Sequence, residues 1–210
     1  MKNIKKEIVF YSNKLIELGL NIGSEGNISY RDEETVFITP SGIDCVRLKE
    51  DKIAEVDFNG KSKNKIKASS ELFMHLFIYK ERPEVKAIIH CHSEWASIVS
   101  CQRLKIPAFH YMVAEFGGID IKCAKYSTFG TKSLAKNVLE AIKLRNGCLI
   151  SNHGQLTLGN SIENALHLAI SLEKLSKQFF FCNLSNKLKV LKKTEMSKVL
   201  RLFKSYKSTH

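Results

Sequence analysis

Short runs of strand-forming residues alternate with helical patterns along nearly the whole chain, and this alternation restricts the possible folds more than any other feature of the sequence. The runs that favour strands are apolar, contain β-branched residues and lie beside turn-forming residues. They cover residues 35–39, 53–58, 85–92, 119–124 and 148–151. Interleaved strands and helices predict an α/β layered domain, and strands that follow one another directly indicate that the sheet is not wholly parallel.

The segments between these runs carry helical spacing of apolar residues or helix-start signals. They cover residues 4–18, 69–82, 131–145, 161–179 and 194–206. In the second segment we expect a serine at the cap and Glu71 in the first turn, and Ser161 and Thr194 are the expected caps of the last two. No linker or internal repeat divides the 210 residues, so residues 1–210 are expected to form a single domain.

The net charge of +12 comes from 33 basic and 21 acidic residues, and 27 of the basic residues are lysines. Arginine, which makes bidentate contacts to bases and phosphates, is scarce, and basic and aromatic residues do not interleave as a stacking surface requires. The charge therefore indicates a solvated, lysine-rich surface that attracts anionic metabolites. Nucleic acid is not an expected partner.

Several features favour a cytoplasmic protein without a membrane partner. No run of about 18 apolar residues is present. Residues 12–14 interrupt the apolar N-terminal stretch, and Glu7 and Glu17 add acids, unlike a signal or transit peptide. The six cysteines form no C-x-x-C pair, which indicates reduced thiols and no disulfide framework.

The strongest local signal for chemistry is His90-Cys91-His92 in a predicted strand. Side chains alternate along a strand, so the two histidines share one face and can converge on a metal, while Cys91 faces the core. His153 follows another predicted strand, beside Gly154, which we expect to let the backbone turn. Three ligands with an open fourth position is the catalytic zinc arrangement. Spacing alone does not select His153 over the other candidates, which are His75, His110 and His167, although His75 and His167 fall in helical segments and there favour surface or packing roles.

Three short segments present small or hydroxyl residues that suit an anion: residues 23–27 (GSEGN), 39–42 (TPSG) and 69–70 (SS). Backbone N–H groups of a glycine-rich turn and of a helix N-terminus bind phosphate readily. Each segment taken singly also suits an ordinary turn or helix cap. Glu71, next to the serine pair, suits either a first-turn acid or a general base near the metal.

The joint order of the motifs is more specific than any one of them. The chain reads GNIS, ITPSGI, SSE, HCH, IPAFHYM, GG, YSTFGT and SNHG, and ends with FKSY. This set resembles the class II aldolase/adducin family, and within it the branch that cleaves ketose 1-phosphates such as L-fuculose 1-phosphate. The resemblance implies a three-layer α/β/α fold with a central, largely antiparallel sheet. It also implies Zn²⁺ as cofactor, a phosphorylated sugar as substrate, and a homotetramer with active sites between subunits.

Family roles can be carried over where the motifs match. His90, His92 and His153 resemble the zinc ligands, and Glu71 resembles the acid that binds zinc in the resting enzyme and then accepts a proton. Tyr111 resembles a catalytic tyrosine that the adjacent subunit supplies. Tyr206 resembles a residue that lines the aldehyde side of the substrate site, and this match rests on FKSY alone. The residues that match the substrate pocket are Gly26, Asn27, Ser41, Gly42, Ser69, Ser70 and Phe129.

The implied reaction is reversible cleavage of a ketose 1-phosphate to dihydroxyacetone phosphate and an aldehyde such as lactaldehyde. Two acids depart from the pattern: Glu25, which must point away from the phosphate loop to avoid repelling the ligand, and Glu115. Within the family, a methylthioribulose-1-phosphate dehydratase and a ketopentose-phosphate 4-epimerase are alternatives, although the epimerase aspartate is absent from YMVAEFGG. A noncatalytic adducin-like interaction module is the alternative of another class, and retention of all three histidines and Glu71 disfavours it.

Overall fold

A computed structural model describes residues 3–208, apart from the side chains of residue 204 and residues 206–208. Its centre is a seven-stranded sheet in the order β3-β2-β1-β4-β9-β8-β7, in which every neighbouring pair is antiparallel except β7 with β8. The strands are β1 (Asn27–Asp32), β2 (Thr35–Ile38), β3 (Ala54–Val56), β4 (Ala87–Cys91), β7 (Cys123–Ala124), β8 (Gly147–Ile150) and β9 (Gly154–Gly159). The prediction of a largely antiparallel central sheet is therefore confirmed.

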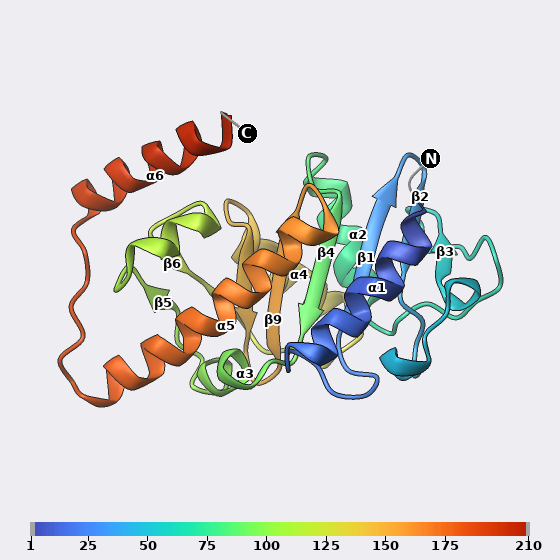
Figure 1. The fold of residues 1–210 in the computed structure, drawn as a ribbon, viewed down its shortest axis with the longest axis horizontal. Helices are drawn as coiled ribbons and strands as arrows, with labels where there is room; N and C mark the ends of the chain where they lie inside the picture. The colour runs from blue at the N-terminus through green and yellow to red at the C-terminus, as the bar shows by residue number, and fades with distance from the viewer. Residues whose placement is uncertain (1–2, 209–210) are drawn as a thin grey trace.

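Helices cover both faces of this sheet. In Figure 1, α1 and α5 lie in front of the strands, while α2 and α4 lie behind them. The helix α3 packs on α5 and so belongs to the front layer. The bounds are α1 (Ile4–Glu17), α2 (Leu72–Glu81), α3 (Glu94–Cys101), α4 (Lys132–Ile142) and α5 (Ile162–Leu184). The three-layer α/β/α architecture predicted from the sequence is confirmed.

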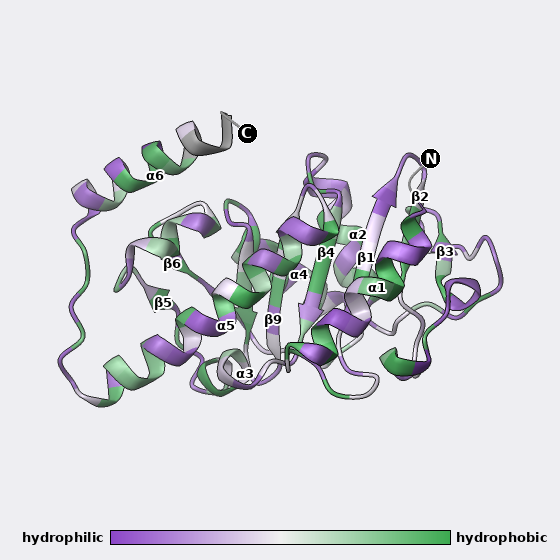
Figure 2. Ribbon diagram, in the orientation of Figure 1, coloured by the Kyte–Doolittle hydropathy of each residue, from purple (hydrophilic) through white to green (hydrophobic). Residues whose placement is uncertain are grey.

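The amphipathic pattern of α1 decides which face it buries. Ile8 and Leu15 are fully buried against the sheet side, while the lysines of the helix remain at least partly exposed. Figure 2 shows the alternating apolar and polar faces of α1 and α5 along the front layer. By contrast, β4 is buried at every position, because strands pair with it on both edges and helices cover both of its faces. Its β-branched run therefore places His90 inside the protein.

A smaller unit extends from the β7 end of the sheet. It contains the two-stranded pair β5 (Ile106–Pro107) and β6 (Asp120–Ile121), and the 3₁₀ helix η3 (Tyr111–Phe116). The last helix, α6 (Lys193–Ser208), passes over this unit (Figure 1). It buries Met196 in an apolar cluster that also contains Ile106, Val113 and Ile121 of the unit. Two further 3₁₀ turns, η1 (Cys45–Arg47) and η2 (Glu50–Lys52), lead into β3.

Several elements differ from the sequence predictions. The strand predicted over residues 119–124 is split at Lys122, because β6 pairs with β5 whereas β7 pairs with β8. Glu71 occupies the N-cap of α2 and not its first turn, and the Ser69 hydroxyl accepts a bond from the Glu71 N–H. The helix α6 begins at Lys193, so Thr194 lies inside it. In contrast, Ser161 caps α5 as predicted, since its hydroxyl accepts a hydrogen bond from the backbone N–H of Asn164, the third residue of the helix.

The short strand β5 and the helix α3 were not predicted, and neither were two strands of the central sheet, β1 and β9. Each of these two sheet strands has only two apolar positions in alternation, too few to stand out in the sequence. The residues between them are polar but buried: Ser29 in β1 and Gln155 and Thr157 in β9 are fully buried. Within residues 3–208, none of the helices combines the length and the apolar character that crossing a bilayer requires.

Candidate metal centre and substrate cavity

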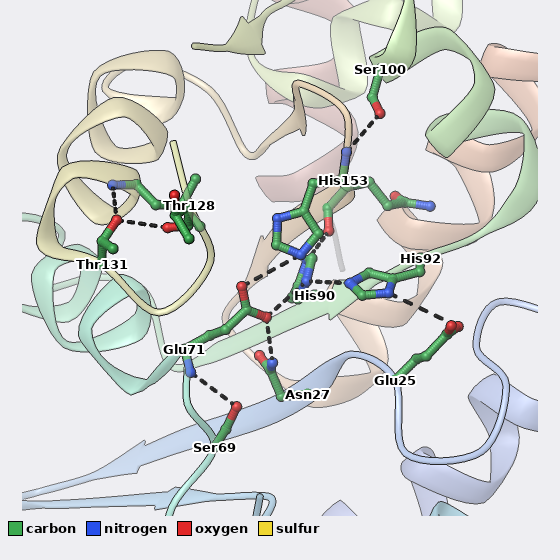
Figure 3. Close-up of polar contacts among 12 residues, drawn as sticks. Glu25, Asn27, Ser69, Glu71, His90, His92, Ser100, Thr128, Thr131 and His153 are labelled. Carbon is green, nitrogen blue, oxygen red and sulfur yellow. Dashed lines mark hydrogen bonds and ion pairs between the residues drawn. The ribbon is translucent and has the colours of Figure 1, made fainter. Parts of the chain in front are cut away.

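Four side chains converge at the end of β4. His90 lies on β4, His92 directly follows the strand, His153 lies in the turn between β8 and β9, and Glu71 caps α2. Their nearest ligand atoms all lie within 4.8 Å of one another. Figure 3 shows the carboxylate of Glu71 facing all three imidazoles. The structure therefore brings together the four residues that the sequence singled out, and among the described histidines His153 is the one that joins His90 and His92.

The spacing of these atoms suits a small cation. The Nε2 atoms of His90 and His92 are 3.1 Å apart, Glu71 Oε2 is 3.0 Å from His90 Nε2, and Glu71 Oε1 is 3.5 Å from His153 Nε2. Ligands about 2.05 Å from a tetrahedral zinc ion would be about 3.3 Å from one another. The observed distances scatter around this value.

The chemistry of the atoms that converge also favours a cation. His90 Nδ1–H donates to the backbone oxygen of Gln155 at 2.7 Å, which leaves a lone pair on Nε2 of the neutral ring. That lone pair faces His92 Nε2 and the Glu71 carboxylate. In addition, Glu71 Oε1 is buried and has no hydrogen-bond partner among the described residues. Imidazole lone pairs that converge with a carboxylate form a ligand set for a divalent metal.

The pKa shifts of the cluster separate His90 from the other two histidines. Burial alone would raise the pKa of Glu71, but the charge and hydrogen bond of His90, the charge of His153 and the Asn27 amide hold it well below its usual range. Burial opposes the charged form of His90, but Glu71 outweighs it and raises the pKa of His90. Burial and the neighbouring His90 lower the pKa of His92 to about 3 and that of His153 to about 4. These two rings are therefore neutral near pH 7, the form that binds metals.

Two glycines allow the backbone to approach the cluster. Gly26 has a φ of +63°, and a Cβ there would collide with the His90 carbonyl oxygen. A Cβ at Gly154 would lie 2.5 Å from the Cys91 carbonyl oxygen. The expectation that Gly154 lets the backbone turn is wrong in its reason: Asn152 takes the left-handed turn, with a φ of +53°, and Gly154 supplies only space.

A cavity of about 390 Å³ opens beside the cluster. It contains all seven residues predicted to contact substrate, together with Glu71, His92 and His153 of the cluster. The seven are Gly26, Asn27, Ser41, Gly42, Ser69, Ser70 and Phe129. The three segments that each suited an anion therefore line one cavity, although they are far apart in the sequence.

The two predicted site tyrosines stand differently toward this cavity. Tyr111 is not among its lining residues; it is half-exposed on η3 and stacks on His110 with ring centroids 5.0 Å apart. Tyr206 falls in α6, but its side chain lies outside the described part of the structure. The cluster and the cavity of one chain are therefore formed without Tyr111.

The cavity also contains residues that the sequence analysis did not assign to it. Tyr126 and Asn152 line it, and so does Glu25, whose carboxylate lies 4.0 Å from His92 Nδ1. The expectation that Glu25 points away from the pocket is wrong. Glu115, the other departure from the pattern, accepts a hydrogen bond from Ser171 on α5. Behind the cavity, His75 is fully buried and its ring bonds to Asn27, so it is a packing residue with a polar connection to the site.

Comparisons with known proteins agree with this site. Residues 6–180 match the family model described as the class II aldolase and adducin N-terminal domain. A 5-methylthioribulose-1-phosphate/5-deoxyribulose-1-phosphate aldolase of Rhodospirillum rubrum is 36% identical over 203 residues, which cover 97% of this chain and 92% of that protein. The L-fuculose phosphate aldolase of Escherichia coli K12 is 36% identical over 204 residues, which cover 97% and 95%. A solved L-fuculose 1-phosphate aldolase structure has a TM-score of 0.93 at 36% identity, over 97% of both chains.

The named relatives are aldolases, and their similarity extends over nearly the whole chain. The resemblance inferred from the motifs is thereby confirmed, as is the prediction of an enzyme of the class II, metal-dependent aldehyde-lyase type. The chain belongs to the class II aldolase and adducin family.

Proposed function

We propose that the chain is a zinc-dependent aldolase that reversibly cleaves a ketose 1-phosphate between C3 and C4 into dihydroxyacetone phosphate and a short aldehyde. One observation carries the proposal: Glu71 belongs at once to the cluster of three histidines and to the lining of a cavity with an anion-binding side. An acid in that position can move a proton at a carbon whose neighbouring oxygens are polarised by a metal.

The residues that would hold the metal are His90, His92, His153 and, in the resting site, Glu71. Imidazole and carboxylate donors at these spacings suit zinc, although other divalent metals accept the same ligands. When bound, the metal supplies Lewis-acid stabilisation of the negative charge that develops on the substrate oxygens. A lysine Schiff base is not needed for this chemistry.

The phosphate would be bound by backbone N–H groups and hydroxyls of the three segments at the cavity wall. Gly26 and Gly42 provide turns with positive φ, and Ser70 lies just before the N-terminus of α2, whose dipole favours an anion. The lining residues of the described chain include no lysine or arginine, so the phosphate would be recognised by neutral donors. The substrate C2 and C3 would then lie toward the cluster.

The reaction needs two proton transfers, which we assign to Glu71 and Tyr111. In cleavage, the O4 hydroxyl loses its proton, the C4–O4 double bond of the aldehyde forms, and the C3–C4 bond breaks with its electron pair moving to C3 and the C2 carbonyl. Tyr111 takes the O4 proton as a phenolate, and Glu71 in its carboxylic acid form supplies a proton to C3. The step ends with a phenol and a carboxylate, which are the forms that the reverse reaction needs. The reverse direction removes that proton from dihydroxyacetone phosphate and forms the carbon–carbon bond.

The aldehyde side of the cavity supports a small aldehyde with an apolar end. Tyr126 and Phe129 line the cavity and remain 54% and 66% exposed, so their rings are available to contact such a group. L-fuculose 1-phosphate, 5-deoxyribulose 1-phosphate and 5-methylthioribulose 1-phosphate all release an aldehyde of this kind. The names of the relatives include all three sugars, and we propose L-fuculose 1-phosphate or a close analogue as the substrate.

We also propose a homotetramer in which each active site lies between two subunits. The exposed position of Tyr111, outside the cavity of its own chain, supports a role in a neighbouring site. Mixing inactive Tyr111→Phe and Glu71→Gln subunits would then restore activity, because some interfaces would combine an intact tyrosine with an intact acid. Mixtures that remain inactive after subunit exchange would contradict the shared site.

The function is tested by the release of dihydroxyacetone phosphate from each of the three sugar phosphates, with and without a chelator. Release that stops with the chelator and returns with zinc is the expected result. A zinc-loaded protein that releases no dihydroxyacetone phosphate but converts 5-methylthioribulose 1-phosphate would favour the dehydratase. A protein that binds no metal would favour an interaction module.

A further inference from the structure

A hydrogen-bonded ladder joins the strand β1 to the helix α2 behind the cavity. Glu71, His75 and Tyr79 lie four residues apart along α2, and Asn27 and Ser29 lie two residues apart along β1. Four helical residues rise about 6.0 Å and two strand residues about 6.8 Å, so side chains at these intervals can meet one another in sequence. The side chains on α2 and those on β1 therefore repeat at nearly the same interval.

The ladder is continuous and buried. Tyr79 Oη lies 2.8 Å from Ser29 Oγ, Ser29 Oγ 2.6 Å from His75 Nδ1, and His75 Nε2 2.5 Å from Asn27 Oδ1. Asn27 Nδ2 then donates to Glu71 Oε2 at 3.1 Å, the contact visible in Figure 3. His75 and Ser29 are fully buried, and Asn27 is 4% exposed. Water therefore cannot replace a missing partner without a rearrangement.

The direction of every bond follows from the Glu71 end. An ionised carboxylate only accepts, so Asn27 must present its NH₂ group to Glu71 and its oxygen to His75. That oxygen requires a hydrogen on His75 Nε2. The neutral ring then has a lone pair on Nδ1, which accepts the Ser29 hydroxyl, and Ser29 in turn accepts the Tyr79 hydroxyl. Burial lowers the pKa of His75 to about 3, which keeps the ring neutral and excludes the alternative with both nitrogens protonated.

We propose that His75 is a positioning residue that acts through Asn27: as the Nε2–H tautomer, it holds the Asn27 amide in the orientation that donates to Glu71. The opposite tautomer would place a lone pair against the Asn27 oxygen and favour a rotated amide. A rotated Asn27 would then point its oxygen at the Glu71 carboxylate and repel it. The tautomer of a histidine outside the cavity thus determines whether the proposed proton acceptor is held or displaced.

The role of His75 in turnover rests on the proposed function, but the tautomer and the amide orientation do not. Because Asn27 bonds to Glu71 Oε2, the other oxygen, Oε1, is left to face the histidine cluster without a hydrogen-bond partner among the described residues. The ladder also opposes protonation of Oε2, since Asn27 offers that oxygen only a donor. We therefore assign proton exchange with the substrate to Oε1.

The tautomer can be read directly in the wild-type protein. Long-range ¹H–¹⁵N spectra of ¹⁵N-histidine-labelled protein should show a protonated Nε2 and an unprotonated Nδ1 for His75, unchanged from about pH 5 to about pH 8. The His75→Gln spectrum identifies the resonance by its absence. A protonated Nδ1, or a ring that titrates within this range, would overturn the proposal even if the aldolase assay fails.

Variants test the consequence for Glu71. Glutamine at position 75 keeps an NH₂ donor near the Nε2 position, whereas leucine fills similar space without a donor. Loss of an outer partner of a metal ligand weakens metal binding by about 10–100-fold, so His75→Leu should weaken zinc binding at least tenfold and His75→Gln much less. In an active enzyme, kcat should follow the same order, with KM changing less.

Tyr79→Phe is the matched control, because it removes a hydroxyl from the far end of the ladder and leaves the Ser29–His75–Asn27 bonds in place. It should keep zinc affinity and kcat within about threefold of wild type, since the His75 tautomer is retained. Equal zinc affinities for His75→Leu and His75→Gln in folded proteins would overturn the proposal. If His75→Leu does not fold, two measurements decide the proposal: the tautomer of His75 in the wild-type protein, and the zinc affinity of His75→Gln compared with that of Asn27→Ala. A His75→Gln protein that binds zinc as weakly as Asn27→Ala contradicts the assigned role.

Discussion

The Nε2 atoms of His90 and His92 lie 3.1 Å apart, although residues two positions apart on a regular strand are separated by about 6.8 Å along its axis. The two rings can converge because β4 ends at Cys91, so that His92 is free of the ladder geometry. Its backbone N–H donates to the Asn21 side chain instead, at 3.0 Å. The end of the strand therefore allows the Nε2 atoms of His90 and His92 to face the same cation position.

Replacement of His92 by alanine should abolish tight metal binding. The wild-type protein is expected to bind one divalent ion per chain, and the ion should stabilise the fold by about 2.7 kcal/mol at a free concentration 100 times its Kd. The variant loses one of three imidazoles and should show neither stoichiometric zinc nor this stabilisation. Zinc content after dialysis and denaturant unfolding with and without zinc measure both. His167→Ala is the control, because that side chain is 63% exposed on α5 and contacts Glu115, which is not part of the cluster.

Replacement of Glu71 by glutamine should separate folding from turnover. Glutamine keeps the size of the side chain but cannot accept a proton, so we expect a folded protein whose kcat falls by about 100-fold or more. The Asn27 amide can still donate to the glutamine oxygen. Exchange of the C3 proton of dihydroxyacetone phosphate with solvent isolates this step from aldehyde binding. Glu140→Gln, an exposed acid on α4, is the matched control, and exchange at the wild-type rate in Glu71→Gln would contradict the assigned role.

The sequence predicted the parts of the site that depend on local spacing. Alternation along a strand pointed to His90 and His92 as a pair, although His92 lies just past the end of β4, and the serine pair before α2 gave the position of Glu71. His153 could not be chosen from the histidines by spacing, because its place depends on the pairing of β4 with β9, in which His90 lies opposite Leu156. That register is a long-range property, and β9 itself was not predicted.

The ladder behind the cavity shows why other parts were missed. Strand β1 alternates with the period of a strand, but the residues that it buries toward α2 are Asn27, Ser29 and Arg31. A search for apolar alternation finds only Ile28 and Tyr30 in this strand, because its face toward α2 is polar. The same polar face gives the helix residue His75 its partners. The signal that could have identified His75 is a helix with polar residues at every fourth position that packs on a strand with polar residues at every second position.

Replacement of Glu25 by glutamine should strengthen phosphate binding. The Glu25 carboxylate lines the cavity and is 46% exposed, so its repulsion of a phosphate acts through partly solvated surroundings. Removal of the charge should lower the inhibition constant of inorganic phosphate by about fivefold, the change that about 1 kcal/mol produces, and the effect should shrink at high salt. Glu34→Gln removes the same charge from the turn at the far end of β1 and should change nothing. Unchanged phosphate inhibition in Glu25→Gln would mean that the anion binds out of reach of this carboxylate.

The buried His75 should make the stability of the protein depend on pH with a definite sign. The pKa of His75 is lowered from 6.5 to about 3 in the folded chain by burial and by the nearby His90. Below about pH 6.5 the unfolded chain therefore binds a proton at His75 that the native protein does not bind. The free energy of unfolding of the wild-type protein therefore falls relative to that of His75→Gln as the pH decreases, by about 1.4 kcal/mol per unit between about pH 6 and about pH 4. Above about pH 7.5 both chains carry a neutral side chain, and the difference between them should be constant. Urea unfolding of the two proteins in the presence of a chelator measures this difference without the pH dependence of metal binding. A difference that stays constant down to about pH 4 would mean that the native protein accommodates a charged His75, and the Ser29 hydroxyl would then face a donor on Nδ1.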